Sequence, residues 1–213
     1  MSTPPRHRLG TVARDGTMAI LVGTVVASVG AYGFQVVGGR VLGAAAFAPV
    51  TALLTVHFLV FTVLLMPVEQ HVIRRITLDE GSFAGARGVE IYVVAAAATG
   101  AAAVFTATTV ERFFGGEPIY VAIIAAAVLT NFILAVGRGH LAGVRRFRSY
   151  GQVSGAVAML RIGLVAAVLP LAASGPTFGW ALAAAPLTVL AWRPLAVPAR
   201  LKETAAAPPG NGT

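Results

Sequence analysis

Residues 18–38 (MAILVGTVVASVGAYGFQVVG) and 44–66 (AAAFAPVTALLTVHFLVFTVLLM) are two long apolar stretches, separated only by the short segment 39–43 (GRVLG). Each is close to the roughly 20 residues with which an α-helix crosses about 30 Å of hydrocarbon. Four stretches of similar character follow, at about residues 91–109, 118–136, 153–173 and 177–192. The sequence therefore predicts six membrane-spanning helices.

The positively charged residues indicate how these spans are oriented. The six stretches are flanked and separated by seven segments, namely two tails and five loops. Of the 16 Lys and Arg residues, thirteen lie in the two tails and in the second and fourth loops. The other three loops contain only Arg40 and Arg112, and Arg161 lies inside the fifth stretch. Because cytoplasmic loops carry the excess of Lys and Arg, this alternation predicts that both termini are cytoplasmic. The thirteen residues are Arg6, Arg8, Arg14, Arg74, Arg75, Arg87, Arg138, Arg145, Arg146, Arg148, Arg193, Arg200 and Lys202.

The overall composition leads to the same fold class. With 57% hydrophobic and 11% charged residues and a mean hydropathy of +0.81, the chain has too little polar surface for a soluble globule. The spans are too long and uninterrupted for barrel strands, so we expect an all-α, polytopic helical bundle in the cell membrane. A pI of about 11.3 follows from topology and from attraction to anionic headgroups, and does not point to nucleic acid.

The chain is expected to contain one membrane domain between two tails. Residues 1–17 form a predicted cytoplasmic N-terminal tail, residues 18–193 the six-helix domain, and residues 194–213 a cytoplasmic C-terminal tail that is expected to be disordered, since residues 204–213 have nothing to bury. The first apolar stretch exceeds the 7 to 15 residues of a cleaved signal peptide, so we expect it to remain as a span. Glycine pairs at helix-packing spacing, Gly39 with Gly43 and Gly151 with Gly155, predict close helix contacts, and Pro186 is expected to kink the last span.

The residues give no indication of an enzyme. None of the eight carboxylates lies in the middle of a span, and the absence of cysteine excludes a thiolate metal site or a cysteine nucleophile. Neither a nucleophile elbow nor a zinc-ligand spacing is present. We therefore expect no catalytic residues, no metal and no cofactor. The carboxylates are Asp15, Glu69, Asp79, Glu80, Glu90, Glu111, Glu117 and Glu203.

Polar residues inside three spans align at helical spacing. Thr24, Ser28, Tyr32 and Gln35 fall on one stripe about 80° wide at 100° per residue. Two similar lines occur in later spans and contain, respectively, Tyr120, Asn131 and Arg138, and Tyr150, Ser154 and Arg161. These seams either hydrogen-bond the helices to one another or line a cavity, and the sequence leaves both interpretations open.

Arg161 is the most informative of these residues, because a guanidinium in the middle of a span costs at least about 2.5–3.5 kcal/mol and does not deprotonate. It must be compensated either by carbonyls and water in a cavity or by an anion that binds and leaves, and a phosphate fits its planar fork. His57, in the second span, is interpreted as a neutral histidine that donates to a neighbouring helix.

Two basic clusters mark the cytoplasmic side. The first cluster follows the second span. We expect a solvated helix edge at Glu69, Gln70 and His71, and we expect Arg74 and Arg75 to contact lipid headgroups or to form a gate. A second cluster, Arg145, Arg146 and Arg148, is accounted for as a topology determinant, with guidance of an anionic headgroup toward the cavity as the alternative.

Several short motifs resemble the polysaccharide flippases of the multidrug/oligosaccharidyl-lipid/polysaccharide exporter superfamily. The segment 39–43 (GRVLG) after the first span, the second span ending near Gln70, and the segment 147–151 (FRSYG) before the Arg161 span are similar to that family over about residues 16–193. The chain departs from it at Phe47 and Ala48, where a Tyr-Gly pair is common. Family members also usually carry at least twice as many spans.

The resemblance implies a transporter of lipid-linked oligosaccharides that works by alternating access between two six-helix lobes. Arg40 occupies the family's arginine position after the first helix, and Arg161 is a candidate cavity cation. Six spans would form one lobe, completed by a second copy or by a separately encoded lobe. The alternatives are an accessory or relic subunit that transports nothing, and a small-molecule exporter.

Overall fold

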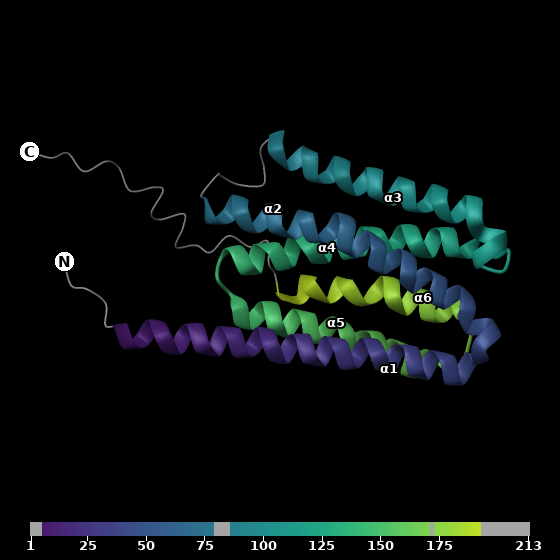
Figure 1. Ribbon diagram of the computed structural model, residues 1–213, viewed down its shortest axis with the longest axis horizontal. Coiled ribbons are helices and arrows are strands. Elements are labelled where there is room, and N and C mark those ends of the chain that lie inside the picture. The colour runs from purple at the N-terminus through teal and green to yellow at the C-terminus, as the bar shows by residue number, and fades with distance from the viewer. Residues whose placement is uncertain (1–5, 79–85, 171–172, 193–213) are drawn as a thin grey trace, which may run out of the picture.

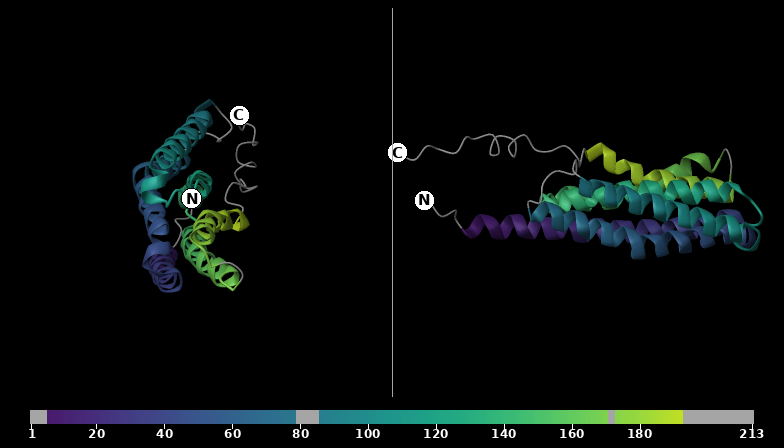
Figure 2. Two further views of the ribbon diagram at one scale, coloured as in Figure 1. Left: turned by 90° about the vertical axis from the view of Figure 1, so that its right-hand side faces the viewer. Right: turned by 90° about the horizontal axis from the view of Figure 1, so that it is seen from above.

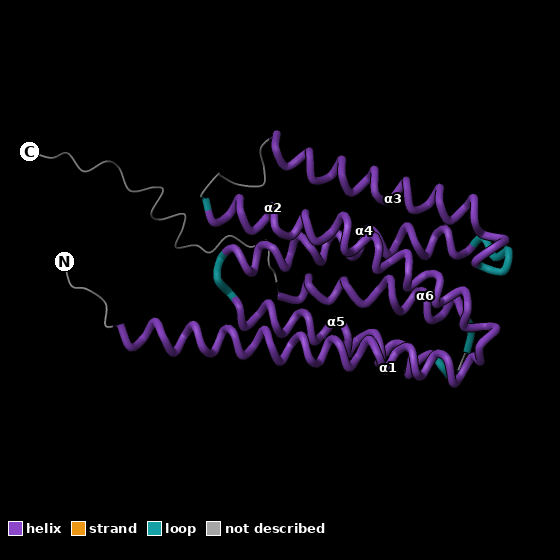
Figure 3. The backbone as a smooth tube through the Cα atoms, in the orientation of Figure 1, coloured by secondary structure: helices purple, strands orange, loops and turns teal. Residues whose placement is uncertain are grey.

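The computed structural model describes residues 6–78, 86–170 and 173–192, with the backbone alone at residues 6–15, 86–89 and 91. This part of the chain contains no strand, and Figure 3 shows its helices and the short loops described between them. The predicted all-α fold is confirmed. The elements are α1 (Arg6–Val60), the π-helix η1 (Phe61–Leu65), α2 (Met66–Thr77), α3 (Ala86–Phe113), α4 (Ile119–Gly143), α5 (Phe147–Val168), α6 (Gly175–Ala184) and the 3-10 helix η2 (Ala185–Trp192).

The chain reverses direction within α1, at Gly43. This residue has φ 75° and ψ 166°, a conformation essentially restricted to glycine, and divides α1 into a first arm, residues 6–42, and a second arm, residues 44–60. Figure 1 shows the two arms running in opposite directions from this turn. The prediction that Gly39 and Gly43 form a helix-packing pair is wrong, because a Cβ at Gly43 would meet no atom within 4 Å.

The second arm continues through η1 into α2 without a further reversal. Pro67 lies in the first turn of α2, where its ring excludes the ordinary hydrogen bond to the carbonyl four residues earlier. The widened π-helical turn at Phe61–Leu65 directly precedes this proline. The second arm, η1 and α2 thus form one long, locally distorted helical rod.

The helices lie approximately parallel or antiparallel in one bundle, and α4 is central to it. Figure 2 shows the helices end-on, and α4 contacts α2, α3, α5 and α6. The described chain starts and ends at the same end of the bundle, where α2 ends, α3 begins and α4 connects to α5 (Figure 1). The turn at Gly43 and the α3–α4 connection lie at the opposite end.

The outer surface of the bundle is strongly apolar. Within the described residues, four helical stretches are long and apolar enough to cross a membrane: Gly16–Thr77, Tyr92–Phe113, Ile119–Gly143 and Phe147–Val168. Large side chains such as Val29, Phe58 and Tyr92 are 63%, 69% and 72% exposed, as expected where lipid replaces water. These features indicate a membrane protein.

Small residues set the closest helix contact, between the first arm of α1 and α5. The backbones touch where Gly23 faces Gly151, and Gly155 lies against Val26. The predicted close contact through Gly151 and Gly155 is confirmed, because a side chain at either side of the Gly23–Gly151 contact would overlap the facing carbonyl. At the other end of the sequence, α6 changes to a 3-10 helix at Ala185, directly before Pro186.

Candidate functional site

A cavity of about 680 Å³ lies between the two arms of α1 on one side and α4 and α5 on the other. The turn at Gly43 places polar residues of the two arms opposite each other, and α5 packs on the first arm, so that several helices contribute to one space. The polar residues that line the cavity are Thr24, Ser28, Gln35, Thr51, Thr55, His57, Asn131, Arg138, Ser154 and Arg161.

Most of the side chains predicted to lie in a cavity do line this one. Those that do are Thr24, Ser28, Gln35, Asn131, Ser154 and Arg161. Tyr32 and Arg40 do not. Tyr32 stands at the extreme edge of its stripe and is 71% exposed on the outer surface, and Arg40 is exposed close to the Gly43 turn.

Three of the seam residues form hydrogen bonds within their own helices. Thr24, Asn131 and Ser154 each donate to the carbonyl four residues earlier, at 2.9, 2.8 and 3.0 Å. Thr51 and Thr55 do the same on the second arm. A hydroxyl bonded in this way keeps lone pairs with which to accept a bond from water or a ligand. The geometry therefore favours the cavity interpretation of the seams.

Arg161 lies about 21 Å along α5 from its first residue, at 1.5 Å per residue, and so well inside the span. Its guanidinium lies over the ring of Phe34, with 5.8 Å from Cζ to the ring centroid. Its Nε is buried and has no hydrogen-bond partner among the described residues, and no ion pair joins it to a described carboxylate. The cavity thus contains a cation that lies against an aromatic ring and has no described carboxylate partner.

The second cavity arginine, Arg138, is paired. Its Nη2 lies 3.5 Å from Oε1 of Glu69 and donates a hydrogen bond to the hydroxyl of Tyr150, which itself donates to Glu69 Oε1 at 2.8 Å. Glu69 is only 4% exposed. The expectation of a solvated edge is wrong for Glu69, because its side chain is buried against Arg138 of α4 and Tyr150 of α5, whereas Gln70 and His71 are exposed.

Two glycines of α4 explain this packing. A Cβ at Gly139 would lie 2.9 Å from the carbonyl oxygen of Glu69, and one at Gly143 would lie 2.8 Å from Cβ of Ile76. The close approach also buries Arg75, which was expected at the surface, whereas Arg74 stays exposed. Of the predicted headgroup or gate residues, Arg145, Arg146 and Arg148 are exposed at the same end of the bundle.

Sequence reasoning missed the cavity roles of His57 and Arg138. The helical line through Asn131 already contained Arg138, but its position next to a basic loop suggested a topology role instead. His57 lies off the threonine stripe of its own helix, and only the position of the facing α5 brings it to the cavity with Arg161.

Comparisons with protein families, with curated proteins and with solved structures found no match to this chain. The site is therefore interpreted from its own chemistry. Within the described residues, no three His, Asp or Glu side chains lie together as possible metal ligands. The groups in the cavity that are able to bind an anion are the guanidinium of Arg161, which has no described carboxylate partner, the guanidinium of Arg138, which is paired with Glu69, and the hydroxyl and amide groups around them.

Proposed function

We propose that this chain is one six-helix lobe of a transporter that moves an anionic, lipid-linked glycan across the cytoplasmic membrane. One observation carries the proposal: Arg161 lies at span depth in a polar cavity of about 680 Å³ without a described carboxylate partner. A charge placed there is expensive, so its retention favours an anion that binds and leaves. The lipid-linked glycan is the substrate class that the sequence resemblance implies.

A multi-pass topology with six spans and both ends in the cytoplasm is supported by the reversal at Gly43. The reversal divides the apolar stretch Gly16–Thr77 into two antiparallel segments, and α6 with η2 would supply the sixth crossing. The basic ends of α2 and α5 share one end of the bundle (Figure 1). Because the chain has no cysteine, Glu117→Cys and Arg146→Cys allow a direct test. An impermeant maleimide added outside intact cells should label only Glu117→Cys; labelling of Arg146→Cys alone would reverse the orientation, and labelling of both would contradict it.

A second lobe is supported by the position of the cavity at the surface. Thr24, Ser28 and Gln35 on the first arm and Thr51 and Thr55 on the second are exposed, although they lie at span depth. Polar groups facing hydrocarbon are unfavourable, so this side requires either water or a protein cover. A second copy of the chain or another six-helix lobe would enclose the cavity and create the two halves that alternating access needs.

The chemistry of substrate binding follows from the two arginines. Arg161 presents a guanidinium that can form paired hydrogen bonds with two phosphate oxygens. Arg138 is neutralised by Glu69, so it is a weaker anion site as long as that ion pair persists. Ser28, Gln35 and Asn131 supply donors and acceptors for sugar hydroxyls.

The test is native mass spectrometry of the gently solubilised protein, with and without added polyprenyl diphosphate. We expect a dimer or a two-lobe heteromer that retains the diphosphate, and an at least tenfold loss of that adduct in Arg161→Gln. Arg112→Gln, an exposed arginine at the far end of α3, is the matched control.

Two outcomes would replace the proposal. A monomer that binds no diphosphate would favour an accessory subunit that transports nothing. Binding that is equally strong in the wild type and Arg161→Gln would place the anion elsewhere. A small-molecule exporter instead predicts that the chain changes cellular resistance to cationic dyes, for which Arg161 would be a handicap.

A further inference from the structure

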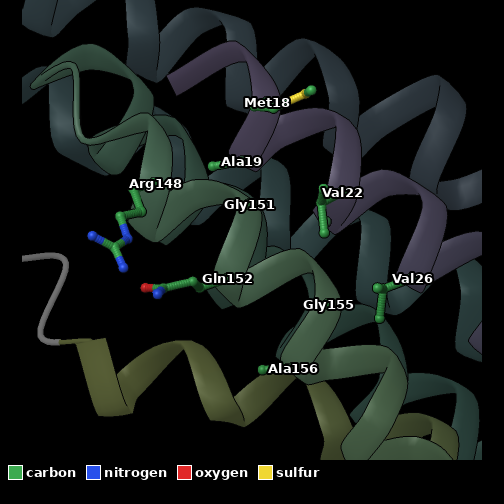
Figure 4. Close-up of a pocket in the computed structure, with 10 residues that line it drawn as sticks. Met18, Ala19, Val22, Val26, Arg148, Gly151, Gln152, Gly155 and Ala156 are labelled. Atoms are coloured by element: carbon green, nitrogen blue, oxygen red, sulfur yellow. The ribbon is translucent and has the colours of Figure 1, made fainter. Parts of the chain in front are cut away.

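A second depression, a groove of about 430 Å³, lies between the first arm of α1 and α5 (Figure 4). Its floor is formed by Gly23, Gly151 and Gly155, which have no side chains to fill it. Apolar side chains line most of the rest, and Arg148 and Gln152 lie at one end. The remaining lining residues are Met18, Ala19, Val22, Val26 and Ala156.

The groove and the polar cavity lie on opposite sides of the same helix pair. Val22 lines the groove and Thr24 lines the cavity. Two residues correspond to a rotation of about 200° around α1, so the two side chains point about 160° apart. The same relation holds on α5 between Gln152 and Ser154. The groove is therefore separate from the proposed transport site and opens on the outer, lipid-facing side of the bundle.

The end of the groove next to the α4–α5 loop is positively charged. Figure 4 shows Arg148 and Gln152 extending from neighbouring turns of α5, and both are exposed. Trp192 Nε1 donates to Gln152 Oε1 at 3.4 Å, which leaves the amide N–H groups of Gln152 to donate to a ligand. The first turn of α5 contains no acidic residue, and its N-cap, Arg146, makes no side-chain capping bond, so the positive helix end adds to the field.

We propose that this groove binds one anionic phospholipid of the cytoplasmic leaflet, with an acyl chain along the α1–α5 contact and the phosphate at Arg148 and Gln152. From Arg148 to Ala156 the groove follows α5 for about 12 Å, at 1.5 Å per residue, which suits the headgroup-proximal part of an acyl chain. A lipid fits the combination of an apolar floor, a cationic end and a position at the edge of the hydrocarbon.

The test compares phosphatidylglycerol with phosphatidylcholine of identical acyl chains. The full chain is released from nanodiscs containing both lipids, and native mass spectrometry counts retained lipid. We expect one retained phosphatidylglycerol, and a reduction of about fivefold in Arg148→Gln, since one arginine contributes on the order of 1 kcal/mol to binding an anionic surface. Arg112→Gln removes the same charge at the opposite end of the bundle and should leave retention within about twofold of the wild type.

A second pair of variants tests the apolar part of the groove without changing charge. Ala156→Leu fills the groove and should remove the retained lipid, whereas Ala167→Leu, at an exposed position near the other end of α5, should not. Equal retention of the two lipids, or retention unchanged in both Arg148→Gln and Ala156→Leu, would overturn the proposal. Loss of a dimer in Ala156→Leu, with lipid retention unchanged, would instead identify the groove as a contact between protein chains.

Discussion

Gly151→Ala is the substitution whose effect follows most directly from the packing of α1 on α5. The new Cβ would lie 2.6 Å from the carbonyl carbon of Ala19 and 3.1 Å from the backbone nitrogen of Ile20. Ordinary carbon contacts are about 3.5–4.0 Å, so the two helices must separate by about 1 Å. Gly163→Ala, on the same helix, is the matched control, because its Cβ would meet nothing within 4 Å.

Two effects of opposite sign act on the free energy of unfolding. Forcing a side chain into a well-packed contact costs about 1–3 kcal/mol, and a flexible neighbour cannot absorb the change here because the facing atoms are backbone. Alanine in place of a helical glycine gains about 0.5–1 kcal/mol, and this gain is the only effect expected for Gly163→Ala. Because both positions lie within α5, this gain is common to the two variants, and their free energies of unfolding should differ by the packing cost of about 1–3 kcal/mol, with Gly151→Ala the less stable.

The assay is titration of each purified variant from mild detergent into SDS, followed by far-ultraviolet circular dichroism. Refolding on dilution of the SDS establishes that the unfolding free energies are equilibrium values. If Gly151→Ala and Gly163→Ala unfold within about 0.5 kcal/mol of each other, the contact between α1 and α5 is not as close as described, and both the groove and the packing argument fail.

The remaining predictions concern the α1 turn and the buried ion pair. Gly43→Ala should lower the unfolding free energy by about 1–3 kcal/mol in the same SDS titration, because its backbone conformation suits only glycine; Gly39→Ala should not, since its Cβ would meet only Phe47, at 3.8 Å. Glu69→Gln and Arg138→Gln should each lower the unfolding free energy by about 1–3 kcal/mol, because each leaves the other side chain without its partner. The double variant should lower it by less than the sum of the two single effects. Strict additivity would show that the two side chains do not interact.

The seams show how far local periodicity extends toward the site. Thr24, Ser28 and Gln35 could be placed on one face of one helix from their spacing alone, and they do share a cavity. Tyr32 satisfies the same spacing but faces outward, because the stripe is wider than the part of the helix that the cavity covers. Helical periodicity determines the direction in which each side chain leaves the helix axis, but it does not determine where a cavity ends.

Glu69 shows what spacing does not reveal. In sequence it lies beside Gln70 and His71 and before two arginines, as a solvated helix end would. It is buried because Gly139 admits α2 close to α4 and because Tyr150 reaches it from α5. These contacts join residues 70 to 81 positions apart, and no local pattern specifies them.

The all-α class, the apolar lengths suited to a bilayer and the unequal distribution of basic residues could be predicted from the sequence, since each depends only on the local match between a helix and its solvent. The absence of a described carboxylate partner at Arg161, the ion pair of Arg138 and the groove behind the cavity depend on how the helices pack together. Helices in a membrane share the same apolar solvent, so their pairing depends on close backbone contacts such as that of Gly23 with Gly151, which form only when the helices meet.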